Sequence, residues 1–189
     1  MSSLAYNVGM NTFNIFVSSR RLAVALSLSL GLASLVAPAA AFDLPSAAPK
    51  GQVLFKITGS IGAKNTPDAA AFDLALLDAL PQKTYATKTP WFKEPAKFSG
   101  PLLRDVLGAA KAKGTVLNAM ALNDYKVLIP MADADTYDVI VVTKLNGKLI
   151  SVRDKGPIFI MYPFDDVPEL KTGVFYGRSI WQLQSMSVQ

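Results

Sequence analysis

The sequence contains no cysteine and no histidine among its 189 residues. Without cysteine the protein has no disulfide bond, no thiolate nucleophile and no Cys-ligated metal centre. Without histidine it lacks the commonest general base and metal ligand. These absences exclude most hydrolase and metalloenzyme designs, and we expect no metal held by protein side chains. An enzymatic function would depend on Asp, Glu, Lys, Tyr or Arg side chains or on a cofactor.

The chain also lacks a strong charge of either sign. It has 19 Lys and Arg residues against 14 Asp and Glu residues, a formal net charge of +5, and no cluster of basic residues. Nucleic-acid binding needs a basic patch or stripe that neutralises phosphates. We therefore expect no nucleic-acid partner.

One long hydrophobic run, residues 22–36, follows Arg20-Arg21 and precedes the small residues 39–41. A charged start, an apolar segment of about 15 residues and an Ala-x-Ala site are typical of a cleavable secretory signal. An uncleaved anchor is the alternative, but spanning a bilayer takes about 20 apolar residues. We predict a signal peptide over 1–41, a periplasmic or secreted protein, and no stable membrane span after cleavage.

The remaining chain is long enough for one domain. Proline and small residues predict a flexible lead-in over 42–51, so the domain covers 52–189. Thr66-Pro67-Asp68 predicts the start of a helix with one apolar face that ends before Pro81. Ser99-Gly100-Pro101 predicts the start of a second helix, which ends before Gly114.

The other patterns are those of strands. Asn146-Gly147 between two apolar segments is the strongest short hairpin signal, and the continuous apolar run 158–162 predicts a central strand buried on both faces. The predicted strands are 52–59, 83–89, 116–122, 125–129, 139–145, 148–152, 158–162 and 180–188. This order predicts an α+β fold with a mixed β-sheet and a few short helices.

Acidic residues gather in two places, and in neither do we favour a cation site: we expect a solvated turn or helix start in the first and a plain acidic loop in the second. Asp133, Asp135 and Asp138 are followed by neither the glycine nor the final acid of an EF-hand loop. The acidic residues between 165 and 169 follow Tyr162-Pro163 and have the composition of a plain acidic loop.

Basic residues lie on both sides of the apolar run 158–162: Arg153 and Lys155 before it, and Lys171 and Arg178 after it. Cations at both ends of a connection can converge on an anion such as phosphate or sulfate, although they can equally be surface charges. The two tryptophans, at positions 91 and 181, are expected to be core anchors, as large aromatic side chains usually are.

Several short motifs occur along the domain in a characteristic order. They are Phe98-Ser99-Gly100-Pro101-Leu102-Leu103, Ala121-Leu122-Asn123-Asp124-Tyr125 with Ile129-Pro130, Asn146-Gly147-Lys148, Arg153-Asp154-Lys155-Gly156-Pro157, Tyr162-Pro163 and Arg178-Ser179-Ile180-Trp181. Their order and spacing resemble the molybdopterin-binding oxidoreductase domain of sulfite oxidase-like proteins. The resemblance covers about residues 53–188 and is greatest to the short, exported, single-domain branch of that family.

Members of the full type hold a molybdenum–pterin cofactor in an α+β fold, with one Cys thiolate on the metal. The resemblance implies that residues 83–91 correspond to the strand that carries this Cys. Thr87, or alternatively Thr89, then stands at the ligand position, facing the metal.

The resemblance also implies how the remaining site residues would act. Arg153, Lys155 and Arg178 would hold the anionic part of the cofactor, and Trp91 and Tyr125 would form walls of the pocket. We therefore expect the three cations to converge on one pocket that includes Thr87 or Trp91.

Two functions remain open. By resemblance the chain is a periplasmic molybdopterin-binding oxidoreductase-like protein. Whether it is an enzyme stays open, because a Thr hydroxyl is a poor substitute for a soft thiolate on the metal. The alternative is a non-catalytic module on the same fold that binds a small anion, a pterin or a periplasmic partner protein.

Overall fold

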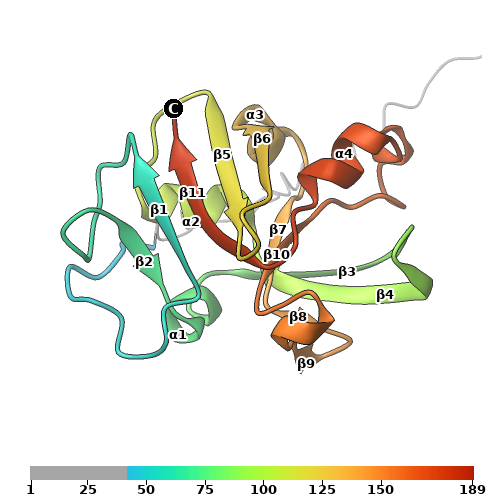
Figure 1. Cartoon of the computed structure of the whole chain (residues 1–189), viewed down its shortest axis with the longest axis horizontal. Helices are drawn as coiled ribbons and strands as arrows, with labels where there is room; N and C mark the ends of the chain where they lie inside the picture. Colours follow the sequence, from blue (N-terminus) through green and yellow to red (C-terminus); the bar gives the residue numbers. More distant parts are fainter. Residues whose placement is uncertain (1–41) are drawn as a thin grey trace, which may run out of the picture. The chain divides into compact units, whose positions relative to one another are not determined.

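A computed structural model describes residues 42–189, and the predicted signal peptide over 1–41 lies outside the described residues. The domain is a mixed α+β structure made mostly of sheet, as the sequence predicts (Figure 1). Its elements are β1 (Phe55–Gly59), β2 (Ala70–Phe72), α1 (Leu74–Asp78), β3 (Gln82–Thr89), β4 (Phe92–Pro101), α2 (Leu103–Ala109), β5 (Val116–Ala121), β6 (Lys126–Pro130), α3 (Ala132–Thr136), β7 (Ile140–Val142), β8 (Lys144–Leu145), β9 (Lys148–Leu149), η1 (Val152–Asp154), β10 (Phe159–Met161), η2 (Pro168–Leu170), α4 (Gly173–Arg178) and β11 (Leu183–Val188). No helix in the described part of the chain has the length and apolarity to cross a bilayer.

The largest sheet has the strand order β2-β1-β11-β5-β6. β11 lies at its centre, parallel to β1 and antiparallel to β5, so segments from opposite ends of the described chain pair directly (Figure 1). Along β1 the side chains of Phe55 and Ile57 are buried and Lys56 between them is exposed. This is the alternation from which the sequence predicts a strand.

A second sheet, of order β3-β4-β8-β9, is built around a long hairpin. The turn between β3 and β4 is formed by Pro90 and Trp91, and in Figure 1 it lies far from β1 and β2. The hairpin predicted at Asn146-Gly147 is confirmed: it joins β8 to β9, with φ angles of 50° and 77° at its two turn residues. Positive φ at both positions is what a tight hairpin turn requires.

The second sheet touches the third, the two-stranded sheet β10-β7, at a point where two backbones approach closely. A Cβ atom added to Gly100 of β4 would collide with the carbonyl oxygen of Val141 on β7. The Thr143 N–H donates to the Ser99 carbonyl at 2.9 Å beside this contact. Gly100 is therefore needed for packing, which explains why the chain stays extended here until Pro101.

The predicted helix starting at Thr66 is wrong. Asn65 bonds to Ala71 twice: its Nδ2 donates to the carbonyl at 2.9 Å, and its Oδ1 accepts from the N–H at 2.7 Å. The Thr66 hydroxyl donates to the Ala69 carbonyl at 2.9 Å. These local bonds compete with a helix, and residues 70–72 pair with β1 instead. The real helix, α1, begins later because the Asp73 carboxylate caps it by accepting from the Leu76 N–H.

Two other boundaries differ from prediction for related reasons. The second helix begins at Leu103, not at Ser99, because Ser99 and Gly100 belong to the ladder between β3 and β4. The run 158–162 is fully buried as predicted. It is not a central strand, however, because β10 pairs with β7 alone, and β11 takes the central place in the largest sheet.

Candidate ligand-binding site

Aromatic side chains gather at the turn of the β3-β4 hairpin. The ring of Trp91 meets Trp181 edge-on, with centroids 4.9 Å apart at 82°, and meets Tyr176 of α4 at 5.7 Å and 80°. Edge-to-face contacts of this kind are favourable because the positive edge of one ring faces the negative face of the other. Two segments that are distant in the sequence, around residue 91 and over 176–181, are therefore joined by aromatic packing.

A cavity of about 270 Å³ opens beside these rings, and we call it the aromatic cavity. Its walls include two of the predicted site residues, Trp91 and Tyr125. The side chain of Trp181 is half-buried rather than a full core anchor, because it forms part of this wall. Further lining residues are Asn123, Tyr176, Ser179 and Gln182.

The indole nitrogen of Trp181 is the most informative atom of this cavity. It is buried, and within the described chain it has no hydrogen-bond partner. Buried N–H groups are almost always paired, since an unpaired donor loses its bonds to water without compensation. A ligand that displaced the protein atoms covering this nitrogen and placed an acceptor beside it would remove that penalty.

Lys155 supplies a positive charge at the edge of the same cluster. Its ammonium lies 4.7 Å from the centroid of the Trp181 ring and 5.1 Å from that of Phe92. Such positions are stabilised by attraction between a cation and the ring face. The ion pairs of residues 42–189 include neither Lys155 nor Arg153, so both charges are free to meet an anion.

Lys155 and Arg153 do not line the aromatic cavity itself. They line a neighbouring depression of about 310 Å³ with Phe92 and Asp154. Because the ammonium of Lys155 rests on the ring of Trp181, this side chain stands at the boundary between the two spaces. A ligand in the aromatic cavity with an extended anionic tail would meet Lys155 first.

Arg178 is placed elsewhere. Its guanidinium donates to the Asp133 carboxylate at 3.0 Å, and the Tyr162 hydroxyl donates to the same oxygen at 2.7 Å. Burial, together with the hydrogen bond to Asp133, raises the pKa of Tyr162, so the hydroxyl stays protonated as a donor. The predicted convergence of three cations on one pocket is therefore not found, because Arg178 is held in a nearly buried ion pair.

Thr87 is also occupied by the structure around it. Its hydroxyl is buried and accepts from the Asp165 N–H at 3.0 Å, while the Asp165 carboxylate accepts from the Lys88 N–H at 2.7 Å. The hydrogen bond from Lys171, followed by that from the Lys88 backbone, lowers the pKa of Asp165. Thr87 thus fastens the end of β3 to the acidic loop and lines neither of the two spaces described above.

A molybdenum–pterin cofactor has two parts, the metal and the planar anionic pterin, and each can be compared with these side chains. The metal needs a thiolate that the sequence does not contain, and the hydroxyl of Thr87 is already engaged. Within residues 42–189, no three His, Cys, Asp or Glu side chains are grouped to hold a metal ion. The metal half therefore does not fit, whereas the planar half would find aromatic rings at the aromatic cavity, and its anionic group would find free cations in the neighbouring depression.

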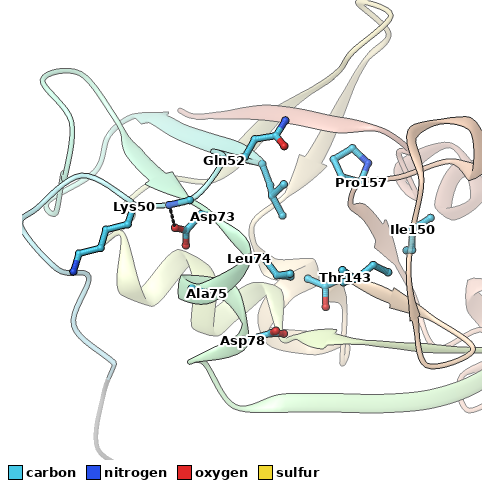
Figure 2. Close-up of a pocket in the computed structure, with 12 residues that line it drawn as sticks. Lys50, Gln52, Asp73, Leu74, Ala75, Asp78, Thr143, Ile150 and Pro157 are labelled. Atoms are coloured by element: carbon cyan, nitrogen blue, oxygen red, sulfur yellow. Dashed lines mark hydrogen bonds between the residues drawn. The ribbon is translucent and has the colours of Figure 1, made fainter.

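A larger cavity of about 660 Å³ lies beside α1, and we call it the aliphatic cavity (Figure 2). Its walls come from the segment before β1, from α1, and from the chain around β9, with Leu54, Leu74, Leu149 and Ile150 among them. The sequence carries no signal for it, because its wall residues come from segments that lie up to more than a hundred residues apart and form no recognisable motif.

Trp181 and Tyr176 are the residues of the aromatic cavity that the sequence-based site omitted. Trp181 belongs to the motif Arg178-Ser179-Ile180-Trp181, but the sequence predicts only a core residue at this position. Nothing in the sequence indicates that its N–H lacks a partner. No protein-family model matches the chain, and no curated protein matches its sequence. The likeness to molybdopterin-binding domains therefore depends on the sequence motifs alone.

Proposed function

We propose that the protein is a non-catalytic binding module that takes a small planar anion of the pterin class in the aromatic cavity. The observation that carries this proposal is the buried, unpartnered N–H of Trp181 in a wall of aromatic rings, with the unpaired ammonium of Lys155 on the same indole. The sulfite oxidase-like fold, suggested by the sequence motifs, is part of the same proposal.

Each feature of such a ligand has a counterpart in the cavity. A planar ring packs on Trp91 and Trp181, and a ring nitrogen or carbonyl oxygen accepts from the Trp181 N–H. A carboxylate or phosphate on the ring meets Lys155, with Arg153 further along the neighbouring depression. The cavity holds about 270 Å³, just below the range of about 300–1,000 Å³ that is usual for ligand cavities, so we expect a ligand no larger than one bicyclic ring.

Export is the second part of the proposal. The charged start, apolar run and small residues of 1–41 have the pattern of a cleaved signal, which would deliver the domain to the periplasm or to the outside. A domain without cysteine folds there independently of disulfide formation. N-terminal sequencing of the purified protein tests this directly: a mature chain that begins near Phe42 supports it, and an intact Met1 contradicts it.

Tryptophan fluorescence during titration with pterin-6-carboxylate tests the ligand. The uncharged analogue 6-methylpterin has the same ring and serves as the comparison. We expect the carboxylate to bind more tightly and to weaken as salt is added, because its attraction to Lys155 is screened. Lys155→Met should remove this advantage and leave 6-methylpterin unchanged.

Two matched variants test the role of the indole N–H. Trp181→Phe keeps an aromatic wall but removes the donor, and should weaken both pterins about tenfold, as the loss of one hydrogen bond in a dry site does. Trp91→Phe also shrinks a wall ring, and it should have a smaller effect because it leaves the Trp181 donor in place. Equal losses in the two variants, or no binding to the wild type, would reject the proposal.

The oxidoreductase function remains the second candidate, and it depends on the sequence motifs. It requires molybdenum in the protein purified from periplasm, in an amount close to one atom per chain. Metal analysis after expression in a molybdate-supplied host decides between the candidates. Stoichiometric molybdenum would favour the enzyme, and its absence alongside pterin binding would favour the module.

A further inference from the structure

The aliphatic cavity is more than twice as large as the aromatic cavity and shares none of its lining residues. Its volume of about 660 Å³ is typical of cavities that bind small molecules, which range over about 300–1,000 Å³. Most of its wall is apolar, including Leu74 of α1 and the well-exposed Leu149 of β9, which is 61% exposed. Apolar surface of this extent gains free energy when a ligand removes it from water.

The carboxylates beside the cavity are already satisfied. Asp73 is buried, and its two oxygens accept from the Gly51 and Leu76 N–H groups at 2.9 Å each (Figure 2). Asp78, at the C-terminal end of α1, accepts from the ammonium of Lys144 at 3.1 Å. Both acids therefore have their hydrogen bonds made, Asp73 with two backbone N–H groups and Asp78 with a cation.

The remaining charged residue in the lining is Lys50, and its ammonium does not point into the cavity. Figure 2 shows its side chain extending away from Leu74, Thr143 and Ile150, into the space on the other side of the chain. An anionic ligand entering the aliphatic cavity would lose its water, meet the carboxylates of Asp73 and Asp78 and gain no free cation, which is strongly unfavourable. The single buried polar side chain without charge in the wall is Thr143, whose hydroxyl makes only a long bond of 3.5 Å to the Ser99 carbonyl.

We infer that the aliphatic cavity is a second ligand site, selective for an uncharged and mainly apolar small molecule with at most one polar group. The apolar body packs on Leu54, Leu74 and Ile150, and the polar group bonds to Thr143. This site is independent of the proposed function, since it shares no lining residue with the aromatic cavity.

Two dyes that differ by one charged group test the inference. N-phenyl-1-naphthylamine is uncharged, and 8-anilinonaphthalene-1-sulfonate has the same rings with a sulfonate. Fluorescence titration of the wild-type protein should show saturable one-to-one binding of the uncharged dye, and at least about tenfold weaker binding of the sulfonate. Equal affinity for the two dyes, or no saturable binding of the uncharged one, overturns the inference.

Variants in the wall locate the dye. Ala75 is exposed and lines the cavity, so Ala75→Phe fills the space without disturbing the core. It should weaken the uncharged dye at least about tenfold. Ala79→Phe adds the same ring at the exposed end of α1, away from the lining, and should have no effect. Unchanged binding in Ala75→Phe contradicts the inference.

A charge introduced into the wall should reverse the selectivity. Leu149→Lys places a cation at the cavity, and the sulfonate dye should then bind better than the uncharged one. Leu128→Lys is the matched control, because Leu128 is 59% exposed on β6 and does not line the cavity. The dye could instead enter the aromatic cavity; in that case Trp181→Phe, and not Ala75→Phe, would weaken it, and the inference would fail while the proposed function stood.

Discussion

The aromatic cavity is built at the turn of the β3-β4 hairpin, whereas the aliphatic cavity lies beside α1, which directly precedes that hairpin. The smaller space has an unpaired N–H and unpaired cations near it, whereas the carboxylates that line the larger space already have their hydrogen-bond donors. Volume and unsatisfied chemistry are therefore separated in this molecule. Cavity volume alone would favour the aliphatic cavity as a ligand site, whereas polar groups without partners favour the aromatic cavity.

The largest expected effect comes from breaking the support behind one cavity only. Asp133→Ala leaves Arg178 and the Tyr162 hydroxyl without their partner, and should lower the free energy of unfolding by about 3 kcal/mol. Because Arg178 ends α4, whose Tyr176 lines the aromatic cavity, pterin binding should also weaken. Urea unfolding measures the first effect, and the uncharged dye should still bind at the aliphatic cavity.

Asp135→Ala is the control for this variant, since Asp135 is exposed on the same helix. Its unfolding free energy should change by less than about 0.5 kcal/mol. Equal destabilisation by the two variants would mean that the ion pair between Asp133 and Arg178 contributes nothing specific.

The next effect compares one wall residue from each cavity. Trp181→Ala should lower stability by about 2 kcal/mol, below the ~3–5 kcal/mol of a fully buried aromatic residue, because the side chain is only half-buried. Leu149→Ala should cost less than about 0.5 kcal/mol, since most of Leu149 is exposed. Thermal unfolding of the two variants provides the comparison. An unchanged melting temperature in Trp181→Ala would show that the aromatic cluster does not stabilise the fold.

A smaller effect concerns the dependence of stability on pH. It should not distinguish the two cavities, because the residue responsible, Asp138, lines neither of them. The hydrogen bond from Lys83, helped by that from Arg104, lowers the pKa of Asp138. The folded state therefore favours the ionised carboxylate, and this stabilisation is present above the ordinary pKa and lost as pH falls through the lowered one. Asp138→Asn should make the unfolding free energy less dependent on pH below about pH 5.

Asp135→Asn provides the control for this pH effect, since Asp135 takes part in none of the ion pairs within residues 42–189. It should keep the wild-type pH dependence. A wild-type slope in Asp138→Asn would show that the bonds to Lys83 and Arg104 form equally well in the unfolded chain.

The smallest expected change in stability comes from the pair at the aliphatic cavity. Asp78 and Lys144 are about one-third exposed, so Asp78→Asn should alter the unfolding free energy by less than about 0.5 kcal/mol. It leaves the Lys144 ammonium without its carboxylate, however, and should raise the affinity of the sulfonate dye. No gain in that affinity would mean that paired charge is not what excludes anions from this cavity.

Much of the fold could be predicted because its signals are local. The Asn146-Gly147 turn and the alternation of buried and exposed residues around Phe55 each predict a local structure from only a few residues. The helix expected from Thr66 begins later than predicted because Asn65, whose side chain is well suited to a helix N-cap, bonds to Ala71 instead and holds a loop. A polar side chain that caps a helix and one that holds a loop by hydrogen bonds have the same sequence signature. Only the pairing of residues 70–72 with β1 shows that this segment is a loop followed by a strand.

The candidate site was predicted less well because it depends on long-range partners. Arg178 is a free cation in the sequence and half of an ion pair in the fold, since Asp133 approaches from another segment. Thr87 likewise meets Asp165 through the folding of distant chain. Trp91 and Tyr125 do line one cavity, but the sequence cannot show that Trp181 beside them keeps an unpaired N–H.

The central place of β11 has a consequence for how the domain assembles. β11 pairs with β1 on one side and with β5 on the other, so before it is in place the largest sheet exists only as the pairs β2-β1 and β5-β6. Contacts between distant parts of a chain form late, because closing the long intervening loop is entropically costly. A nascent chain would therefore lack its main sheet until residues 183–188 had been synthesised.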